Sequence, residues 1–562
     1  MLTILIENPS DLLESAVFRE MSPDPTSSAS IHLIRSWVDN CHNSHSQCKR
    51  ALDYTLPTRV IDVSGHDLRL RELKSKNAPY ITLSHCWGMK GTMTTLKSNL
   101  SSHRHCINSS TLPQTFLDAV IITKKLGIPY LWIDSLCILQ DSEEDWLEEC
   151  PKMGTYYRNS YITISALESP DSHHGFLNSR SSVDAVEIAN TGVWMRHKCL
   201  HWREIFRKAV LNQRGWFLQE RLLSTCILHF TEQEILWECQ SSTARESSFM
   251  EYCQPTDYKS LVSSEGDDFK RCLFSDNSDK FGRDEAYDVW MRLVRQFSQR
   301  SLTYSSDRLP AISSLAALMA TKTESPYIAG IWSNDLHGLA WFSDGPGERI
   351  CHQFMDSSRS SVAPSWSWAN LKSSITYRFN DEERVKTNED PILIDAHTPL
   401  LGSDPFGSVS GGFITIQALT KPVQCLDFER FSDLSQSIFG YVGPVDPRGG
   451  RSRFDALGLY ICGEDGKIVG TGSFDDPVVA TLHRCKAIRI AERVYKGRLS
   501  SADSRRGLRK NQNIIYFLLA KPDPQCSGSW RRVGMGLTRN FESHEFYDDF
   551  FDLWDWEELR LT

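Results

Sequence analysis

Apolar runs alternate with amphipathic stretches between residues 78 and 165. "PYITLSHCW" predicts a strand, and "TFLDAVIITKKLG" has the spacing of a helix. "IPYLWIDSLCIL" is apolar almost throughout, as expected of a strand buried on both faces, and "YITIS" predicts a third strand. Strands and helices therefore alternate as βαβαβ, which predicts an α/β domain with a mainly parallel, helix-covered sheet.

Local signals mark the ends of the helices in this region. Gly127 follows a helical pattern and predicts a left-handed cap. Ser142 is followed three residues later by Asp145, which indicates a capping-box start. Pro151 lies inside the second helical pattern and predicts a kink, because proline cannot donate a backbone hydrogen bond.

The pattern changes after residue 166. "STCILHFTEQEILWEC" contains two apolar runs around a polar turn and predicts a hairpin. Helical spacing returns from 284 to 320, and short β-type runs dominate beyond 360. We divide the 562 residues into an N-terminal helical segment (1–77), an α/β domain (78–240), a polar linker or surface excursion (241–283), a helical region completing the α/β module (284–370) and a β-rich C-terminal region (371–562).

Composition and charge narrow the class of protein. The formal net charge of -9 argues against general attraction to nucleic acid or to an anionic membrane surface. No apolar stretch approaches the roughly 20 residues that span a bilayer, and the first residues lack the basic flank of a secretory signal. We expect a cytoplasmic protein whose 16 cysteines are mostly reduced and buried.

Cys41, His45 and Cys48 stand close together, at C-x3-H-x2-C spacing. They supply three of the four ligands that a structural zinc site needs, but the sequence does not identify a fourth. A helix end packed by buried cysteines explains the same residues and is the interpretation that we favour.

"LSHCWG" places serine, histidine and cysteine next to one another. Side chains alternate along a strand, so Ser84 and Cys86 share one face and His85 points to the other. A nucleophile and its base must lie within hydrogen-bond reach, which such neighbours do not. The pattern therefore favours a buried structural thiol over a cysteine hydrolase.

The predicted strand ends offer positions for a ligand, because open α/β sheets bind ligands beyond the carboxyl ends of their strands. Gly88 allows close approach of the backbone, and Trp87 either stacks on a planar ring or anchors the core. Asp134 stands in an apolar strand and needs a partner, either backbone amides or a ligand hydroxyl. Neither a Walker loop nor a G-x-G-x-x-G motif occurs in this unit.

Three long stretches carry a family resemblance. "PYITLSHCWG", "LGIPYLWIDSLCILQDSEEDWLEECPKMGTYYRNSYITISAL" and "RGWFLQERLLS" with its "LWEC" resemble, in order, the motifs of the fungal heterokaryon-incompatibility (HET) domain. The flanking stretches "WVDNCHNSHSQC", "LPTRVIDV", "LTYSSDRLPAISSLA" and "APSWSWA" also resemble that family. The resemblance implies a protein of filamentous fungi that acts in nonself recognition, a form of innate immunity, and triggers programmed cell death.

The HET family is in turn similar to TIR domains, which have a flavodoxin-like fold, act in signalling assemblies and, in some members, cleave NAD. In enzymatic TIR domains the essential glutamate follows a tryptophan on a helix, and "WFLQE" places Glu220 correspondingly. The resemblance thus implies Glu220 as the catalytic residue, with NAD as substrate and no cofactor or metal required. The candidate nucleotide-binding residues are Ser84, Trp87, Gly88, Asp134, Gln140, Arg214 and Trp216.

Some features favour other interpretations. Leu139 stands where the HET motif usually has asparagine, and Pro151 interrupts a motif helix, so this chain departs from the family pattern. Glu220 would alternatively be a solvated helix charge that pairs with Arg221 or Arg214. The chain would then be a non-catalytic signalling module that acts through self-association or an unknown protein partner, or a scaffold with no trigger of its own.

Overall fold

The computed structural model describes residues 19–427 and 459–562, except 20, 50–53, 74–75, 90, 181–185, 188–193, 196–199, 249–250, 253–268, 275–281, 344–362, 372, 378–381, 464–467, 476–482, 496–512 and 539–553. The chain forms two compact units, residues 1–281 with 300–302, and residues 282–299 with 303–562. Helices from 284–370 thus group with the C-terminal region, whereas the sequence grouped that segment with the α/β module. No described helix has the length and apolar character needed to span a bilayer.

A mixed sheet forms the core of the first unit, with nine strands in its described part, in the order β11-β10-β9-β8-β5-β3-β4-β1-β2. The strands are β1 (Val60–Asp62), β2 (Arg69–Arg71), β3 (Tyr80–Ser84), β4 (Tyr130–Trp132), β5 (Ile162–Ala166), β8 (Cys226–Phe230), β9 (Ile235–Cys239), β10 (Thr243–Arg245) and β11 (Glu251–Tyr252). A separate short pair comprises β6 (Val186–Glu187) and β7 (Trp194–Met195). The sheet continues past residue 240, since β10 pairs with β9.

The central strands β4, β3, β5 and β8 are parallel, and every residue in them is buried. Numbered along the chain, their spatial order is 2-1-3-4, as in flavodoxin-like sheets. The flanking strands are antiparallel. The prediction of an α/β domain followed by a β-rich region is confirmed, but its mainly parallel sheet is confirmed only for these four strands. A short turn joins β8 to β9 as predicted, and so short a connection permits only antiparallel pairing.

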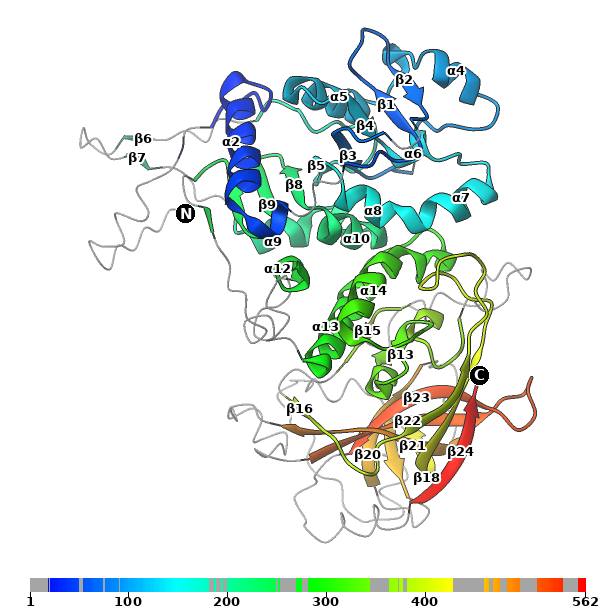
Figure 1. Ribbon diagram of the computed structural model, residues 1–562. Coiled ribbons are helices and arrows are strands. Elements are labelled where there is room, and N and C mark those ends of the chain that lie inside the picture. The colour runs from blue at the N-terminus through cyan, green and yellow to red at the C-terminus, as the bar shows by residue number, and fades with distance from the viewer. Residues whose placement is uncertain are drawn as a thin grey trace. The chain divides into compact units, whose positions relative to one another are not determined.

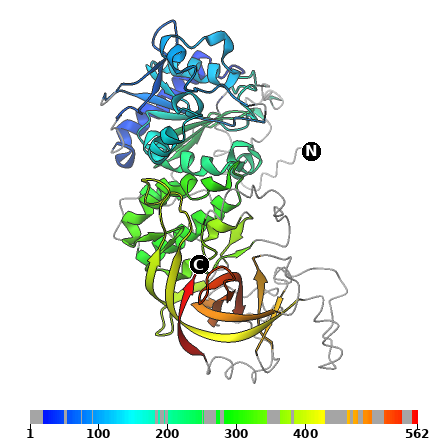
Figure 2. The ribbon, with the colours of Figure 1, turned by 90° about the vertical axis from the view of Figure 1, so that its right-hand side faces the viewer.

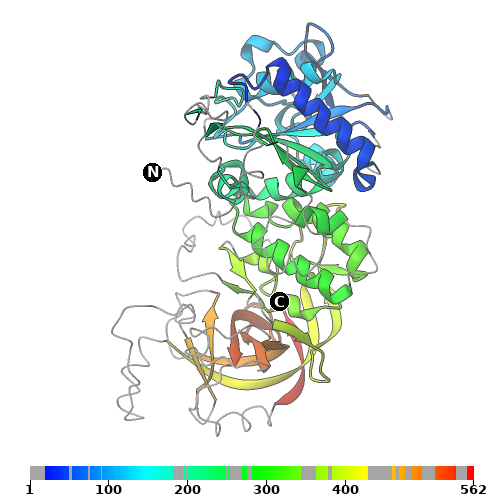
Figure 3. The same ribbon diagram turned by 90° about the vertical axis from the view of Figure 1, so that its left-hand side faces the viewer.

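Helices cover both faces of this sheet. The described helices are α2 (Ser28–Ser44), α3 (Ser46–Lys49), α4 (Leu100–His105), α5 (Gln114–Leu126), α6 (Asp134–Cys137), α7 (Glu143–Glu149), α8 (Met153–Arg158), α9 (Trp202–Lys208), α10 (Gly215–Leu223) and α12 (Phe269–Phe274). Figures 1 and 3 show α2 and α5 on one face, and α8 and α10 on the other. Both faces of the parallel strands are therefore shielded from solvent, as their apolar sequences require.

The predicted left-handed cap and helix break are confirmed, and α7 starts where predicted, although with only the Ser142 half of the predicted capping box. Gly127 caps α5 in the left-handed conformation, with φ of 78°. The Ser142 hydroxyl accepts a hydrogen bond from the Asp145 amide at the start of α7. Pro151 lies in a 3-10 turn, Cys150–Lys152, that separates α7 from α8. A proline in the helical pattern thus ends one helix and starts another.

The second unit combines α13 (Arg283–Ser298) and α14 (Pro310–Thr323) with a curved sheet (Figure 2). The sheet strands are β16 (Glu382–Val385), β17 (Ile392–His397), β18 (Phe413–Asp427), β19 (Leu459–Cys462), β20 (Ile468–Phe474), β21 (His483–Tyr495), β22 (Asn513–Pro522), β23 (Trp530–Thr538) and β24 (Asp555–Leu561). Two short pairs join β12 (Tyr327–Ile328) to β13 (Ile331–Trp332) and β14 (Phe342–Ser343) to β15 (Ile375–Thr376). Because β18 pairs with both β19 and β21, part of the large sheet closes into a ring.

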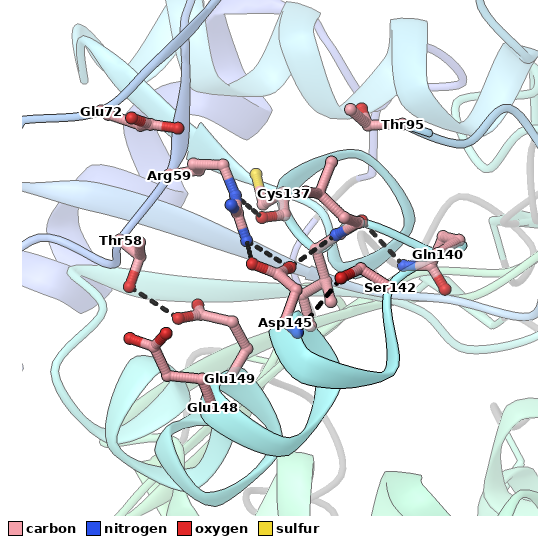
Figure 4. A network of polar contacts seen from close by, with 12 residues as sticks. Thr58, Arg59, Glu72, Thr95, Cys137, Gln140, Ser142, Asp145, Glu148 and Glu149 are labelled. Atoms are coloured by element: carbon pink, nitrogen blue, oxygen red, sulfur yellow. Dashed lines mark hydrogen bonds and ion pairs between the residues drawn. The ribbon is translucent and has the colours of Figure 1, made fainter. Parts of the chain in front are cut away.

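Arg59, next to β1, holds the loop that follows β4 (Figure 4). Its Nε donates to the carbonyl of Cys137 at 2.6 Å, and its Nη2 donates to Asp145 Oδ1 at 2.7 Å. Asp145 Oδ2 also accepts from the Leu139 amide at 2.8 Å. Since Arg59 is only 5% exposed, these charge-assisted bonds are shielded from water and fix the loop in place.

Replacing Arg59 with lysine should lower the free energy of unfolding of the full chain by about 1–3 kcal/mol. Lysine cannot donate to Cys137 and Asp145 with the same planar geometry. Arg71→Lys is the control, because Arg71 is more exposed and its Nε lies 3.7 Å from Asp62 Oδ2; we expect a change within about 0.5 kcal/mol. Urea unfolding followed by circular dichroism measures both, and equal midpoints would refute the role of Arg59.

Candidate functional site

A buried carboxylate lies at the carboxyl end of β3. Ser84, the last residue of β3, donates its hydroxyl to Glu220 Oε2 on α10. Buried Tyr157, on α8, also lies near this carboxylate, and its hydroxyl donates to the carbonyl of Leu83 at 3.3 Å. Glu220 is only 2% exposed, so the interpretation of this residue as a solvated helix charge is wrong.

Glu220 lies at the edge of the sheet where this strand order places a ligand site. From β3 the chain runs outward to β4, and then returns past β3 to form β5 on its other side. The connections therefore leave β3 and β5 in opposite directions at their carboxyl ends. Ligands of open α/β sheets bind at such switch points, and Ser84 pairs with Ser165 of β5 there.

The protonation of Glu220 is finely balanced. The pKa of Glu220 is raised to about 7, mainly by burial and to a smaller extent by the nearby charge of Asp134. The Arg214 guanidinium, the hydrogen bond from Ser84 and the nearby Tyr157 hydroxyl oppose this effect, because they favour the carboxylate. A carboxyl group with a pKa near 7 exchanges a proton readily at physiological pH, which is typical of catalytic sites.

Trp87, in the loop beyond β3, contacts Asp134, which is the first residue of α6 and follows β4. The prediction that Asp134 lies inside a strand is therefore wrong. The indole Nε1 of Trp87 donates to Asp134 Oδ2 at 3.0 Å, and the amide of Ser135 donates to Oδ1 at 2.7 Å. Asp134 thus has the backbone partner that its sequence context requires. Trp87 is half-buried, and the bond to Asp134 fixes the orientation of its ring.

Arg214 approaches the cluster from the start of α10. Its Nη1 donates to the carbonyl of His85, and its charge interacts with Glu220 and Asp134. Arg221, the other predicted partner of Glu220, instead donates to Glu238 Oε2 at 2.8 Å. The structure therefore brings Ser84, Trp87, Asp134, Arg214 and Glu220 together around one position.

The other three predicted residues have local roles. Gln140 Nε2 donates to the carbonyls of Ile138 at 3.0 Å and Asp134 at 3.3 Å, so it braces its own loop. Trp216 packs edge-to-face on Trp146, with ring centroids 5.9 Å apart. Gly88 has φ of 78°, and a Cβ there would lie 2.2 Å from the Cβ of Asp171. Glycine at 88 thus permits a close packing contact.

The strand alternation predicted for "LSHCWG" is confirmed. The His85 ring packs edge-to-face on Phe116 of α5, 5.0 Å between centroids, whereas Ser84 contacts α10 on the opposite face. Burial lowers the pKa of His85 to about 4 and raises the pKa of Cys86 to about 11. Neutral histidine and protonated thiol at pH 7 agree with the structural interpretation of both residues.

Sequence reasoning missed Tyr157 and the buried group around Glu238. Tyr157 lies on the buried face of its helix, but helical spacing alone could not show that its hydroxyl reaches α10. Glu238 accepts from Arg221 and contacts His229 Nε2 at 3.1 Å. The sequence contains a signal for Glu238, because this glutamate stands inside the apolar run "ILWEC", where an unpaired charge would be costly.

Glu220 should make stability depend on pH in a way that Glu220→Gln removes. Because the folded pKa of about 7 lies above the usual 4.5, the native state binds the proton more tightly. The stabilisation is complete below about pH 4.5 and is lost as the pH rises to about 7. Relative to Glu220→Gln, the wild type should lose about 2–3 kcal/mol between pH 5 and pH 8.

Urea unfolding at a series of pH values measures this difference. Glu144→Gln is the matched control, since Glu144 is exposed on α7, and its stability should parallel that of wild type at every pH. Parallel curves for wild type and Glu220→Gln would show that the carboxyl group titrates normally and would contradict the assignment.

Comparison with known families gives one match. The family model of the heterokaryon incompatibility protein (HET) matches residues 80–220. The resemblance seen in the sequence motifs is thereby confirmed over this segment, which begins at β3 and ends at Glu220. Searches among curated proteins and among solved structures found no significant match.

Proposed function

We propose that this chain, which carries a HET domain over residues 80–220, acts in fungal nonself recognition and that the domain triggers cell death by hydrolysing NAD. The observation that carries the enzymatic part is the Glu220 carboxyl group, buried beside Ser84 at the switch point of the parallel strands, with its pKa raised to about 7. Burying such a group costs free energy. Groups with strongly shifted pKa values are concentrated at functional sites.

The reaction would break the bond between nicotinamide nitrogen and C1 of the adjoining ribose. The bonding electron pair leaves with nicotinamide, and the sugar acquires positive charge at C1 until water adds there and releases a proton. The ionised Glu220 carboxylate would stabilise that charge and bind the ribose hydroxyls, by the logic of glycoside hydrolysis. Ser84 would hold the carboxylate in orientation.

The surrounding residues fit the rest of the dinucleotide. Trp87, fixed by Asp134, offers a half-buried ring for stacking on nicotinamide or adenine. Arg214 offers a guanidinium for the diphosphate. Because Glu220 is 2% exposed, the loops carrying Trp87 and Arg214 must separate to admit the ribose, so binding would involve opening of this edge.

A non-catalytic signalling module is the second candidate function. The same low exposure of Glu220 favours it, because a carboxyl group enclosed by Ser84, Tyr157 and Arg214 also serves to join α10 to β3 and α8. In that case the HET domain would act by self-association or by binding a protein partner.

Release of nicotinamide from NAD by the purified full chain distinguishes these functions. We expect Glu220→Gln to lower the rate by about 10²-fold or more, since it removes a charge that stabilises the transition state. Glu144→Gln, on the exposed face of α7, should retain the wild-type rate. Equal rates for wild type and Glu220→Gln would remove Glu220 from the mechanism.

Cell death after expression in a fungal host provides the companion readout. The enzymatic function predicts that folded Glu220→Gln fails to kill, whereas Glu144→Gln kills as wild type does. Killing by folded Glu220→Gln, together with no release of nicotinamide by wild type at any protein concentration, would establish the assembly function instead.

A further inference from the structure

The folded chain adds a fourth residue to the Cys41, His45 and Cys48 group. Cys239, the last residue of β9, brings its Sγ close to them, and the four ligand atoms all lie within 4.8 Å of one another. Cys239 Sγ lies 3.4 Å from His45 Nδ1. In a tetrahedral zinc site, with Zn–S near 2.3 Å, neighbouring ligand atoms are about 3.5–3.8 Å apart, so small side-chain adjustments suffice.

The backbone around Cys239 is arranged for a thiolate. The amides of Ser241 and Ser242, in the turn after β9, point at Cys239 Sγ at 3.4 and 3.2 Å. Amide hydrogen bonds to sulfur stabilise negative charge and are typical second contacts of zinc-bound cysteine. Cys41, Cys48 and Cys239 are each at most 1% exposed, so water contributes little to stabilising charge there.

A buried positive charge stands near the cysteines. Lys270, on α12, is 1% exposed, and its Nζ has no hydrogen-bond partner in the described part of the chain. Its charge interacts with Cys239 and Glu238. Three thiolates, one neutral imidazole and Zn²⁺ together carry a net charge of -1, which a neighbouring ammonium group would offset.

We propose that Cys41, His45, Cys48 and Cys239 bind a structural zinc ion. Three sulfur ligands and one imidazole form one of the common ligand sets of closed zinc sites, and four protein ligands leave no position for a substrate. The sequence identifies three of these ligands, and the fold supplies the fourth, 194 residues from His45.

The zinc would fasten the N-terminal helices to the sheet. Cys41 lies on α2, His45 is the residue that caps it, and Cys48 lies on α3. Cys41 Sγ is also 3.5 Å from the Sγ of Cys226, the first residue of β8. The metal group thus lies at the amino end of β8, whereas Ser84 and Glu220 lie at the carboxyl end of β3, so this inference does not depend on the NAD reaction.

The test is the zinc content of the full chain, purified under reducing conditions and equilibrated with zinc before free metal is removed. We expect about one zinc per chain by elemental mass spectrometry. A mercurial reagent that modifies thiols should release that zinc, as measured with a chromophoric chelator. Cobalt in place of zinc should give the visible absorption of tetrahedral thiolate coordination.

Three single substitutions locate the metal. Cys239→Ser should reduce the bound zinc at least tenfold, whereas Cys226→Ser, a neighbouring buried cysteine outside the four, should retain it. His45→Cys preserves four ligands and should also retain it, which keeps the test decisive if Cys239→Ser does not fold. Folded, reduced wild type without zinc, or loss of zinc only on Cys226→Ser, would overturn the proposal.

Discussion

Parallel pairing of β3 with both β4 and β5 determines which edge of the sheet carries the candidate site. Parallel strands end at the same edge of a sheet, so the segments that follow β3 and β4 emerge side by side there. Trp87 follows β3 and Asp134 follows β4, which is why residues 47 positions apart in sequence form a hydrogen bond. The helix α10 places Glu220 against Ser84 at this edge.

Burying the Glu220 carboxyl group costs free energy, and the surrounding side chains offset part of that cost. An isolated carboxylate would be expelled from such an environment or remain protonated. Ser84, Tyr157 and Arg214 together favour the charged form, while burial and Asp134 oppose it. Burial and Asp134 outweigh the other effects, so the pKa of Glu220 is raised to about 7, whereas the pKa of Glu238 is lowered despite burial because Arg221 pairs with it.

Local sequence signals predicted local structure well. The strand alternation at Ser84 and His85, the cap at Gly127 and the break at Pro151 depend on residues close together in the chain, and the structure confirms all three. The three central parallel strands of the βαβαβ pattern were also visible, because burial on both faces leaves continuous apolar runs. The second run was nevertheless predicted too long, since β4 ends at Trp132 and the helix α6 begins at Asp134. The family resemblance added Glu220, which spacing alone would not have singled out.

Features that depend on distant contacts were not predictable in the same way. β1 and β2 have only three residues each, too few for a periodic signal, so the antiparallel flank of the sheet went unrecognised. Arg221 adjoins Glu220 in sequence but points to Glu238, since consecutive helix residues face different directions. Cys239 lies close to Cys41, His45 and Cys48 only in the folded chain. No rule of sequence spacing links positions so far apart.

A structure of the full chain with a carbocyclic, non-cleavable analogue of NAD tests the central claim most directly. The account predicts the ribose hydroxyls within hydrogen-bond distance of the Glu220 carboxylate, a base stacked on Trp87 and the diphosphate at Arg214. An analogue bound elsewhere, with Glu220 still enclosed by Ser84 and Tyr157, would contradict the assignment of this edge as a nucleotide site.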